Sequence, residues 1–343
     1  MKPEAAGIVL ERTIELASVP APPLDEADRA ANVVARLRDG QGPATFVAAH
    51  LDTVFGRDVP HRAEQHGTRL NGPGVGDNTV SVAALSVLDA LLPRQLDRPV
   101  WIVATVGEEG LGNLAGVLHL VQDPPAGIGA LIALEGNYLG RVVTVGVGSV
   151  RWSLELAGPG GHAWEAADNP STIHDLARII ARLDPLLATP AAGPGARSTS
   201  VTSREESPST SEPGGLRFVS ISPLPTRWFS PISIPEPAAW VNAEKSPLVT
   251  ANFKELGKRP AGSIPAAHPL VKAAADALAE VGIQPEYAAA SNDANAAGIP
   301  AITLGITVGS GEHTHGEWIE TEPIGTGLAA LADTIIRYDR KAG

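Results

Sequence analysis

Residues 44–55 read ATFVAAHLDTVF and decide how the rest of the chain is interpreted. The apolar run from Thr45 to Ala49 has the length and composition of a buried strand, and His50 and Asp52 follow where that strand should end. Alternate positions of an extended chain face the same side, so these two side chains are expected to lie together. The pattern fits a metal-binding histidine that is oriented by a carboxylate. A capped strand end with a chance His-Asp pair is the alternative.

Similar apolar segments lie on both sides of this strand, and segments with helical periodicity separate them. Strands are expected over 32–38, 100–106, 130–134, 142–147, 150–156 and 301–306, and helices over 5–19, 78–92, 171–187, 269–281 and 324–338. Apolar strands that alternate with helices are typical of a mostly parallel sheet with helices on both faces. We therefore predict an α/β fold whose site lies at the carboxyl ends of the strands.

The middle of the chain has a different composition. Residues 198–247 contain 11 Ser and 8 Pro, and regular patterns are hard to find there. We predict a catalytic domain in two parts, residues 1–148 and 258–343. A smaller α+β domain over 149–257 is inserted between them, with 198–250 as its atypical part.

Composition and charge exclude several classes of protein. The chain has 26 Lys and Arg against 38 Asp and Glu, a net charge of −12 that argues against binding to a nucleic acid. Without Cys there are no disulfides or thiolate nucleophiles, and any metal must bind through His, Asp and Glu. Charged residues interrupt the N-terminal segment, and no stretch approaches the ~20 apolar residues of a membrane span. We expect a cytoplasmic protein that does not bind membranes.

A glycine-rich loop is the second motif, at residues 72–77 (GPGVGD), directly before an expected helix. Its three glycines permit an unusual backbone path that places Asp77 near the helix N-terminus. A capping aspartate is the common explanation of such a residue, and metal binding is the functional one. A phosphate-binding loop is disfavoured because no Gly-Lys-Ser/Thr sequence follows.

Two adjacent carboxylates, Glu108 and Glu109, follow the strand expected over 100–106 and have apolar or glycine neighbours. They repel each other unless a cation lies between them or one of them is protonated. A divalent metal resolves this conflict, because one glutamate can bind it while the other holds a proton for acid–base chemistry. Two exposed glutamates in a solvated loop are the alternative.

Three further groups extend the set. Glu135 follows another apolar strand, and residues 311–319 (GEHTHGEWI) supply His313 and His315. Two imidazoles and three carboxylates suit two closely spaced divalent ions, zinc or a zinc-like metal, which activate a water and polarise a carbonyl or phosphoryl oxygen. The five candidate ligands are His50, Asp77, Glu109, Glu135 and His313.

The order of these motifs resembles the di-zinc metallohydrolase family of carboxypeptidase G, peptidase T, acetylornithine deacetylase and aminoacylase. The resemblance rests on His-x-Asp at 50–52, Gly-x-Gly-x-x-Asp at 72–77, Gly-Glu-Glu-Gly at 107–110 and His-Thr-x-x-Glu at 313–317. Further matches lie at 158–162 (GPGGH), 259–262 (RPAG), 291–295 (SNDAN) and 298–300 (GIP). It covers about residues 5–190 and 255–340 and implies a zinc-exopeptidase-like catalytic domain with an inserted lid and dimerisation domain.

The resemblance also implies the metal ligands. His50, Asp77 and Glu135 would hold one zinc, and Asp77, Glu109 and His313 the other, with Asp77 bridging both. His313 is preferred over His315 because His313 starts the His-Thr-x-x-Glu motif. Cobalt or manganese can replace zinc in sites of this type.

Catalytic roles follow from the same resemblance. Glu108 would be the general base that deprotonates the attacking water and later protonates the leaving amine. Asp52 would orient His50. His162 would come from the lid domain, in many members from the partner subunit, and stabilise the oxyanion.

The implied reaction is hydrolysis of an amide bond in a small peptide or an N-acyl amino acid, and the implied assembly is a homodimer formed through the lid. Glu rather than Asp at position 135 favours the carboxypeptidase and deacylase members over the aminopeptidases. Two alternatives stay open. One is a catalytically impaired relative that retains metal or peptide binding, and the other is a two-metal phosphoesterase, which the paucity of basic residues near the motifs disfavours.

The sequence departs from the family pattern in two places. Only Pro20 to Ala31 fill the place of a family helix and strand. The lid pattern is lost after Arg197 and resumes near Glu255, although the insert keeps a lid's length. Translation out of frame between two compensating shifts explains this loss, and so does a divergent or partly disordered lid. An unambiguous reading frame through codons 198–250 in the DNA would exclude the first explanation.

Overall fold

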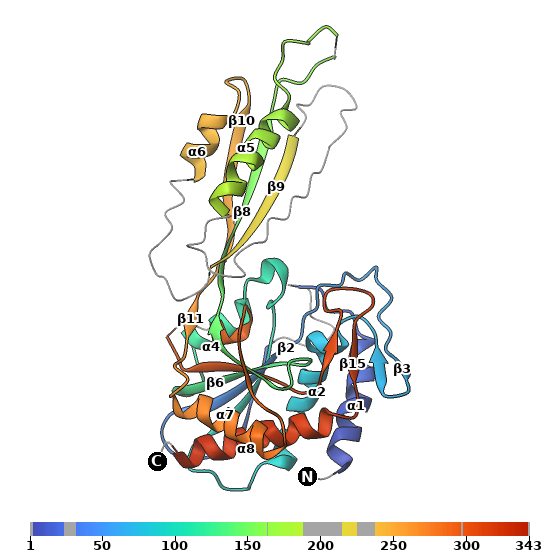
Figure 1. Cartoon of the computed structure of the whole chain (residues 1–343), viewed down its shortest axis with the longest axis vertical. Helices are drawn as coiled ribbons and strands as arrows, with labels where there is room; N and C mark the ends of the chain where they lie inside the picture. The colour runs from blue at the N-terminus through green and yellow to red at the C-terminus, as the bar shows by residue number, and fades with distance from the viewer. Residues whose placement is uncertain are drawn as a thin grey trace. The chain divides into compact units, whose positions relative to one another are not determined.

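The structure, a computed structural model, describes residues 3–23, 32–162, 164–187, 215–224, 237–295 and 298–341 (Figure 1). It divides into two compact units, of which unit 1 comprises Met1–Gly146 with Pro260–Gly343 and unit 2 comprises Val147–Arg259. The chain therefore leaves unit 1 once and returns to it.

Unit 1 is built on an eight-stranded sheet in the order β1-β5-β2-β6-β13-β7-β11, with β12 paired to β7. β2 runs parallel to β5 and β6, β13 runs parallel to β6, and β12 runs parallel to β7. The strands are β1 (Val33–Arg38), β2 (Ala44–His50), β5 (Val100–Thr105), β6 (Ile128–Glu135), β7 (Arg141–Gly146), β11 (Gly262–Ser263), β12 (Glu286–Ala290) and β13 (Ala301–Gly305). The predicted α/β fold with a mostly parallel sheet is confirmed.

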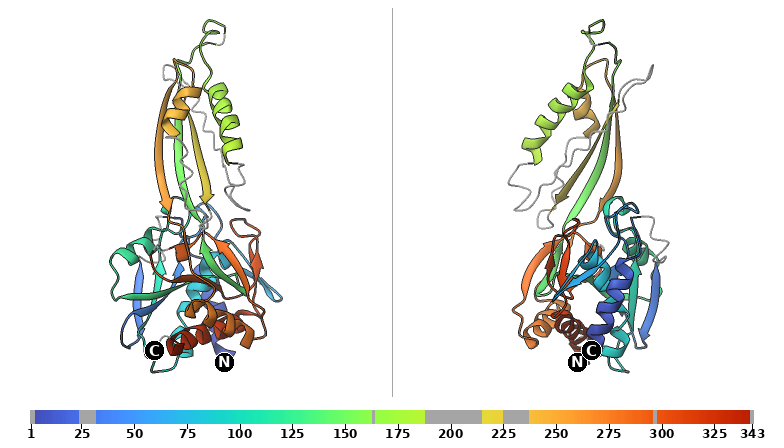
Figure 2. Two further views of the ribbon diagram at one scale, coloured as in Figure 1. Left: turned by 60° about the vertical axis from the view of Figure 1, so that its left-hand side comes forward. Right: turned by 90° about the vertical axis from the view of Figure 1, so that its right-hand side faces the viewer.

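Helices cover both faces of this sheet because alternate side chains of its strands point in opposite directions. In β2, Phe46 and Ala48 pack with Val117 and Leu120 of α4 on one face. Val47 and Ala49 join the larger core on the other face, which the remaining helices of unit 1 complete (Figure 2). The helices are α1 (Pro3–Ala17), α2 (Val80–Leu85), α3 (Leu88–Leu91), α4 (Ala115–Gln122), α7 (Pro269–Glu280) and α8 (Ile324–Lys341). Among the described residues, no helix has both the length and the apolar character that crossing a membrane requires.

The helix expected over 78–92 is interrupted in the structure. A single irregular turn, η1 (Val75–Thr79), precedes α2, and Asp77 and Asn78 within it have non-helical backbone angles. Two residues separate α2 from α3. At this break the N–H groups of Ser86 and Val87 donate to carbonyls three residues back instead of four. The Ser86 hydroxyl also donates to the Ala83 carbonyl, at 2.5 Å, in competition with the helical ladder.

A second, antiparallel sheet in unit 1 has the order β14-β15-β4-β3. Its strands are β3 (Glu64–His66), β4 (Arg69–Asn71), β14 (Gly309–Ser310) and β15 (Trp318–Glu320). The pairing of Trp318 with Asn71 brings the loop between β14 and β15 to the glycine-rich loop that follows β4. Neither this sheet nor its strands were expected from the sequence. Two short 3-10 turns, η2 (Gly110–Gly112) and η4 (Asp293–Asn295), complete unit 1.

In its described residues, unit 2 consists of a three-stranded antiparallel sheet with two helices packed on it. The strand order is β10-β8-β9, and Leu154 and Leu156 of β8 pack with Leu176 and Ile179 of α5 and with Val241 of α6. The elements are β8 (Gly148–Ala157), α5 (Thr172–Leu187), β9 (Gly215–Leu224), α6 (Pro237–Glu244) and β10 (Thr250–Arg259). The stretch 198–250, expected to lack regular patterns, thus contributes β9 and α6. Its residues 198–214 and 225–236 lie outside the described residues.

Candidate metal centre

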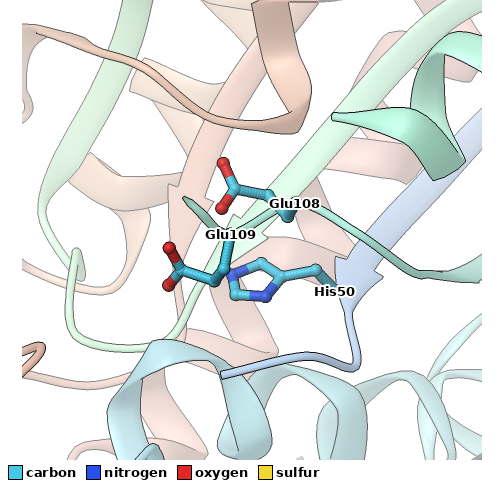
Figure 3. A group of neighbouring side chains, drawn as sticks. All are labelled: His50, Glu108 and Glu109. Carbon is cyan, nitrogen blue, oxygen red and sulfur yellow. The ribbon is translucent and has the colours of Figure 1, made fainter. Parts of the chain in front are cut away.

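Three neighbouring strand ends place the first candidate residues. His50 is the last residue of β2, Glu135 is the last residue of β6, and Glu108 and Glu109 follow the end of β5. Because β5, β2 and β6 are adjacent and parallel, their carboxyl ends meet at one edge of the sheet. Figure 3 shows the His50 imidazole at the end of its strand, with the side chains of Glu108 and Glu109 beside it.

One group of ligand atoms joins His50, Asp77 and Glu135, whose donor atoms lie within 4.8 Å of one another. His50 Nε2 is 3.0 Å from Asp77 Oδ1 and 3.9 Å from Glu135 Oε2. The Asn78 side chain donates to the carbonyl of Leu134, at 2.6 Å, and so ties the Asp77 segment to the end of β6. His50 and Glu135 are both buried.

A second group joins Asp77, Glu109 and His313. His313 Nε2 lies 3.0 Å from Asp77 Oδ2 and 3.1 Å from Glu109 Oε1. Asp77 therefore faces a histidine with each of its two carboxylate oxygens. His313 lies in the loop between β14 and β15, has a left-handed backbone conformation (φ 62°), and its side chain is 56% exposed.

Asp52 holds the surroundings of His50 in place. Its carboxylate accepts hydrogen bonds from the N–H groups of Glu108, at 3.1 Å, and Glu109, at 2.7 Å. His50 Nδ1 lies 3.0 Å from the Asp52 carbonyl and 3.6 Å from its carboxylate. Since both neighbours are acceptors, Nδ1 carries the proton, and the lone pair of Nε2 is left for a metal.

The electrostatics of the centre favour bound cations. Burial lowers the pKa of His50, but the nearby carboxylates of Asp52, Asp77 and Glu135 outweigh it and leave that pKa well above its usual range. Hydrogen bonds with Asp77 and Glu109 raise the pKa of His313 to about 11. Burial raises the pKa of Glu135 to about 7, whereas the two histidines hold the pKa of Asp77 low despite its burial. Without a metal, protons on the two histidines would supply the positive charge that the carboxylates favour, and bound metal ions would take their place.

These residues fit divalent metal ions. His50 Nε2 is buried and has no hydrogen bond of acceptable geometry among the described residues, although Asp77 Oδ1 is 3.0 Å away. This contact between His50 Nε2 and Asp77 Oδ1 is more consistent with two ligands of one metal ion than with a hydrogen bond between them. Imidazole nitrogens with carboxylate oxygens form the donor set that zinc and similar metals accept. The buried Glu108 also reaches this centre, since His50, Glu108 and Glu109 form a third group of converging ligand atoms.

His315 and His162 are the remaining candidates. The ring of His315 is 5.7 Å from the ring of Phe55, and within the described part of the chain His315 belongs to no group of converging ligand atoms. His162 belongs to unit 2, where it is exposed in the loop after β8, and its Nδ1 accepts a hydrogen bond from the N–H of Trp164 at 3.4 Å.

Glu317 is the residue that the sequence analysis left without a role. It is fully buried and accepts hydrogen bonds from the glycine-rich loop that carries Asp77. Burial raises its pKa to about 8, against the opposing effect of those hydrogen bonds. Its place as the last residue of the His-Thr-x-x-Glu motif was the signal that could have found it.

Imidazoles and buried carboxylates gathered at the carboxyl edge of a parallel sheet are the donor set and the location expected of a metal-dependent hydrolase. The chain belongs to peptidase family M20/M25/M40, whose family model matches residues 46–337. The family expected from the motifs is thereby confirmed. No curated protein matches the sequence.

Solved structures share the fold over nearly the whole chain. A tripeptidase from Staphylococcus aureus has 16% identity and a TM-score of 0.70, with 98% of this chain and 99% of that one covered. The dipeptidase Dug1p from Saccharomyces cerevisiae has 13% identity and a TM-score of 0.70, with coverage of 98% and 97%. The Bacillus subtilis YXEP protein, described as a dinuclear metal-binding peptidase, has 15% identity and a TM-score of 0.65, with 98% of each chain covered.

Proposed function

We propose that this protein hydrolyses an amide bond in a small peptide or an N-acyl amino acid and uses two divalent metal ions. The observation that carries the proposal is the position of Asp77, whose two carboxylate oxygens each lie 3.0 Å from a different histidine. One carboxylate shared by two ligand groups suits a pair of closely spaced ions.

The proposed ligands fall into two sets that share Asp77. His50, Asp77 and Glu135 bind one ion, and Asp77, Glu109 and His313 bind the other. Zinc is the favoured metal, with cobalt or manganese as substitutes, because sites with these ligands accept several metals according to supply. The ions would lower the pKa of a water molecule and polarise the carbonyl of the scissile bond.

Glu108 is the proposed general base. Its carboxylate accepts a proton from the attacking water and then donates it to the amine that leaves. Asp52 supports this role because it fixes the backbone N–H of Glu108 and orients His50. His162 in unit 2 donates to the oxyanion that forms on the substrate, and unit 2 would also form a homodimer.

The substrate class is proposed from the relatives. The named tripeptidase and dipeptidase act on short peptides, and this chain covers almost all of their length. An exopeptidase and a deacylase use the same chemistry, so dipeptides, tripeptides and N-acyl amino acids are the substrates to test.

Metal content and turnover test the proposal together. Purified, dialysed protein should contain about two divalent ions per chain by elemental mass spectrometry, and a chelator should stop hydrolysis of short peptides or N-acyl amino acids. Glu108→Gln should reduce the rate by ~10²–10⁴-fold, the contribution of general acid–base catalysis, with metal content unchanged. A chain that binds no metal after zinc is supplied would overturn the proposal, and metal binding without hydrolysis would indicate an impaired relative.

A further inference from the structure

Glu317 lies at the centre of a set of backbone donors. Its Oε1 accepts hydrogen bonds from the N–H groups of Gly76, at 2.7 Å, and Asp77, at 2.8 Å, and its Oε2 accepts one from Gly74, at 2.7 Å. The carbonyl of Glu317 accepts a fourth bond, from the N–H of Gly72, at 3.0 Å. A side chain from the far end of the chain therefore shapes the loop that ends in Asp77.

The glycines of this loop make the contact sterically feasible. Gly74 has a left-handed conformation, with φ 70°, which turns successive N–H groups toward one point, as in backbone concavities that bind anions. A Cβ on Gly76 would lie 3.1 Å from Glu317 Oε1 and 2.9 Å from Cγ2 of Ile319. The loop thus binds an internal carboxylate in the manner of a phosphate-binding loop.

We propose that Glu317 is the positioning residue that fixes Asp77 and His313 relative to each other, and so assembles the ion site that these two residues share. This inference rests on the proposed two-metal function. Glu317 follows His313 by four residues in the same loop, and its hydrogen bonds hold the backbone of Asp77 itself. One buried side chain therefore sets two ligands that are 236 positions apart.

A carboxylate suits this task better than its amide. The N–H groups of Gly74, Gly76 and Asp77 donate to both carboxylate oxygens of Glu317. In a glutamine side chain, only the oxygen accepts hydrogen bonds, so the amide nitrogen would face one of these N–H donors. A buried donor left unpaired is costly, so the loop would move. Movement of the Asp77 backbone changes the distance from Asp77 to His313, and metal affinity responds to such shifts even when no ligand is removed.

The test compares Glu317→Gln with Glu320→Gln, a matched control in the same sheet whose carboxylate interacts with Arg69 and Thr68 and with none of the candidate metal ligands. Metal-free wild type and both variants are titrated with zinc by calorimetry, and the visible absorption of each cobalt-loaded protein is recorded. Glu317→Gln should weaken one of the two binding events by ~10–100-fold and change the cobalt spectrum. Its kcat should fall at a nearly constant KM, while Glu320→Gln should match the wild type in every measurement.

Wild-type zinc affinities and a wild-type cobalt spectrum in folded Glu317→Gln would overturn the inference. If that variant does not fold, Gly76→Ala replaces it, since the added methyl group crowds Glu317 Oε1 from the loop side. Gly76→Ala should then weaken the same zinc-binding event, and wild-type zinc affinities in this variant would overturn the inference. A wild-type protein that binds no metal would instead refute the proposed function.

Discussion

The two histidines of the candidate centre lie in different structural surroundings. His50 ends the central strand β2, has 1% of its side chain exposed, and is held by the backbone of Asp52. His313 lies in a loop between two short strands, and 56% of its side chain is exposed. Asp77 connects the two, with one oxygen on each histidine. We call the ligand set of His50, Asp77 and Glu135 the buried half, and that of Asp77, Glu109 and His313 the open half.

This difference in surroundings indicates that the ligands of the buried half are held more rigidly than those of the open half. Ligands on packed strands keep their positions without a metal, whereas a ligand on an exposed loop depends on what holds the loop. We therefore expect the buried half to bind its ion first and release it last. The open half should exchange its ion more readily, and it faces solvent from which a substrate can enter.

The largest effect is expected from Asp77→Ala, which would break both halves at once. Each half loses a ligand, and the two histidines lose the carboxylate that they share. Bound metal should fall from about two ions per chain to less than one, and hydrolysis should be lost. Elemental mass spectrometry after dialysis measures this, and a variant that keeps both ions would show that Asp77 does not bridge the two halves.

A pair of histidine variants should separate the halves. His50→Ala removes a buried ligand and should abolish tight binding of the first ion. His313→Ala should leave that ion in place and weaken only the second, by more than the ~10–100-fold that loss of a supporting residue costs. Calorimetric titration of each metal-free variant with zinc distinguishes the outcomes. Equal losses in both variants would contradict the assignment of one histidine to each half.

Asp52→Asn should have a smaller effect, concentrated in the buried half. The carboxylate of Asp52 accepts two backbone N–H groups, and an amide can accept only from its single oxygen. We expect ~10–100-fold weaker binding of the first ion, typical of losing a residue that supports a ligand. Zinc titration measures this loss. Asp58→Asn is a control, since Asp58 lies outside every group of converging ligand atoms in the described residues.

The smallest effect is a pH dependence of the metal-free protein. The pKa values of Glu135 and His313 are raised to about 7 and 11, above their ordinary values of 4.5 and 6.5. The folded state therefore holds protons that the unfolded chain has released, and its stability should fall as the pH rises from about 4.5 to 7 and beyond. Denaturant unfolding at several pH values measures this, and stability that rises over the same range would contradict it.

Much of the fold could be predicted because its central strands are mostly apolar. The segment from Ala44 to His50 is buried at every position, so composition alone marks it as a central strand. The breaks and short elements could not be predicted. The interruption after Leu85 depends on hydrogen bonds three residues back, and β3, β4, β14 and β15 are too short to show a period.

The candidate site divides in the same way. His50, Glu109 and Glu135 follow apolar strands, so parallel pairing brings them to one edge, and the sequence pattern carries that information. The role of Glu317 depends on backbone N–H groups more than 200 positions away, which no local pattern encodes. β9 and α6 could not be predicted within 198–250, because the prolines and serines there interrupt the apolar patterns that mark strands and helices.

The paired strands at the boundary of unit 1 have a consequence for how this protein can vary. Gly146, where the chain leaves unit 1, pairs with Gly262, just after it returns. An insertion whose two ends are already adjacent adds little closure entropy to the folding of its host, whatever its length. As far as the folding of unit 1 is concerned, the segment between those glycines should therefore tolerate exchange, shortening or rewriting. A short hairpin turn in its place should leave unit 1 able to fold.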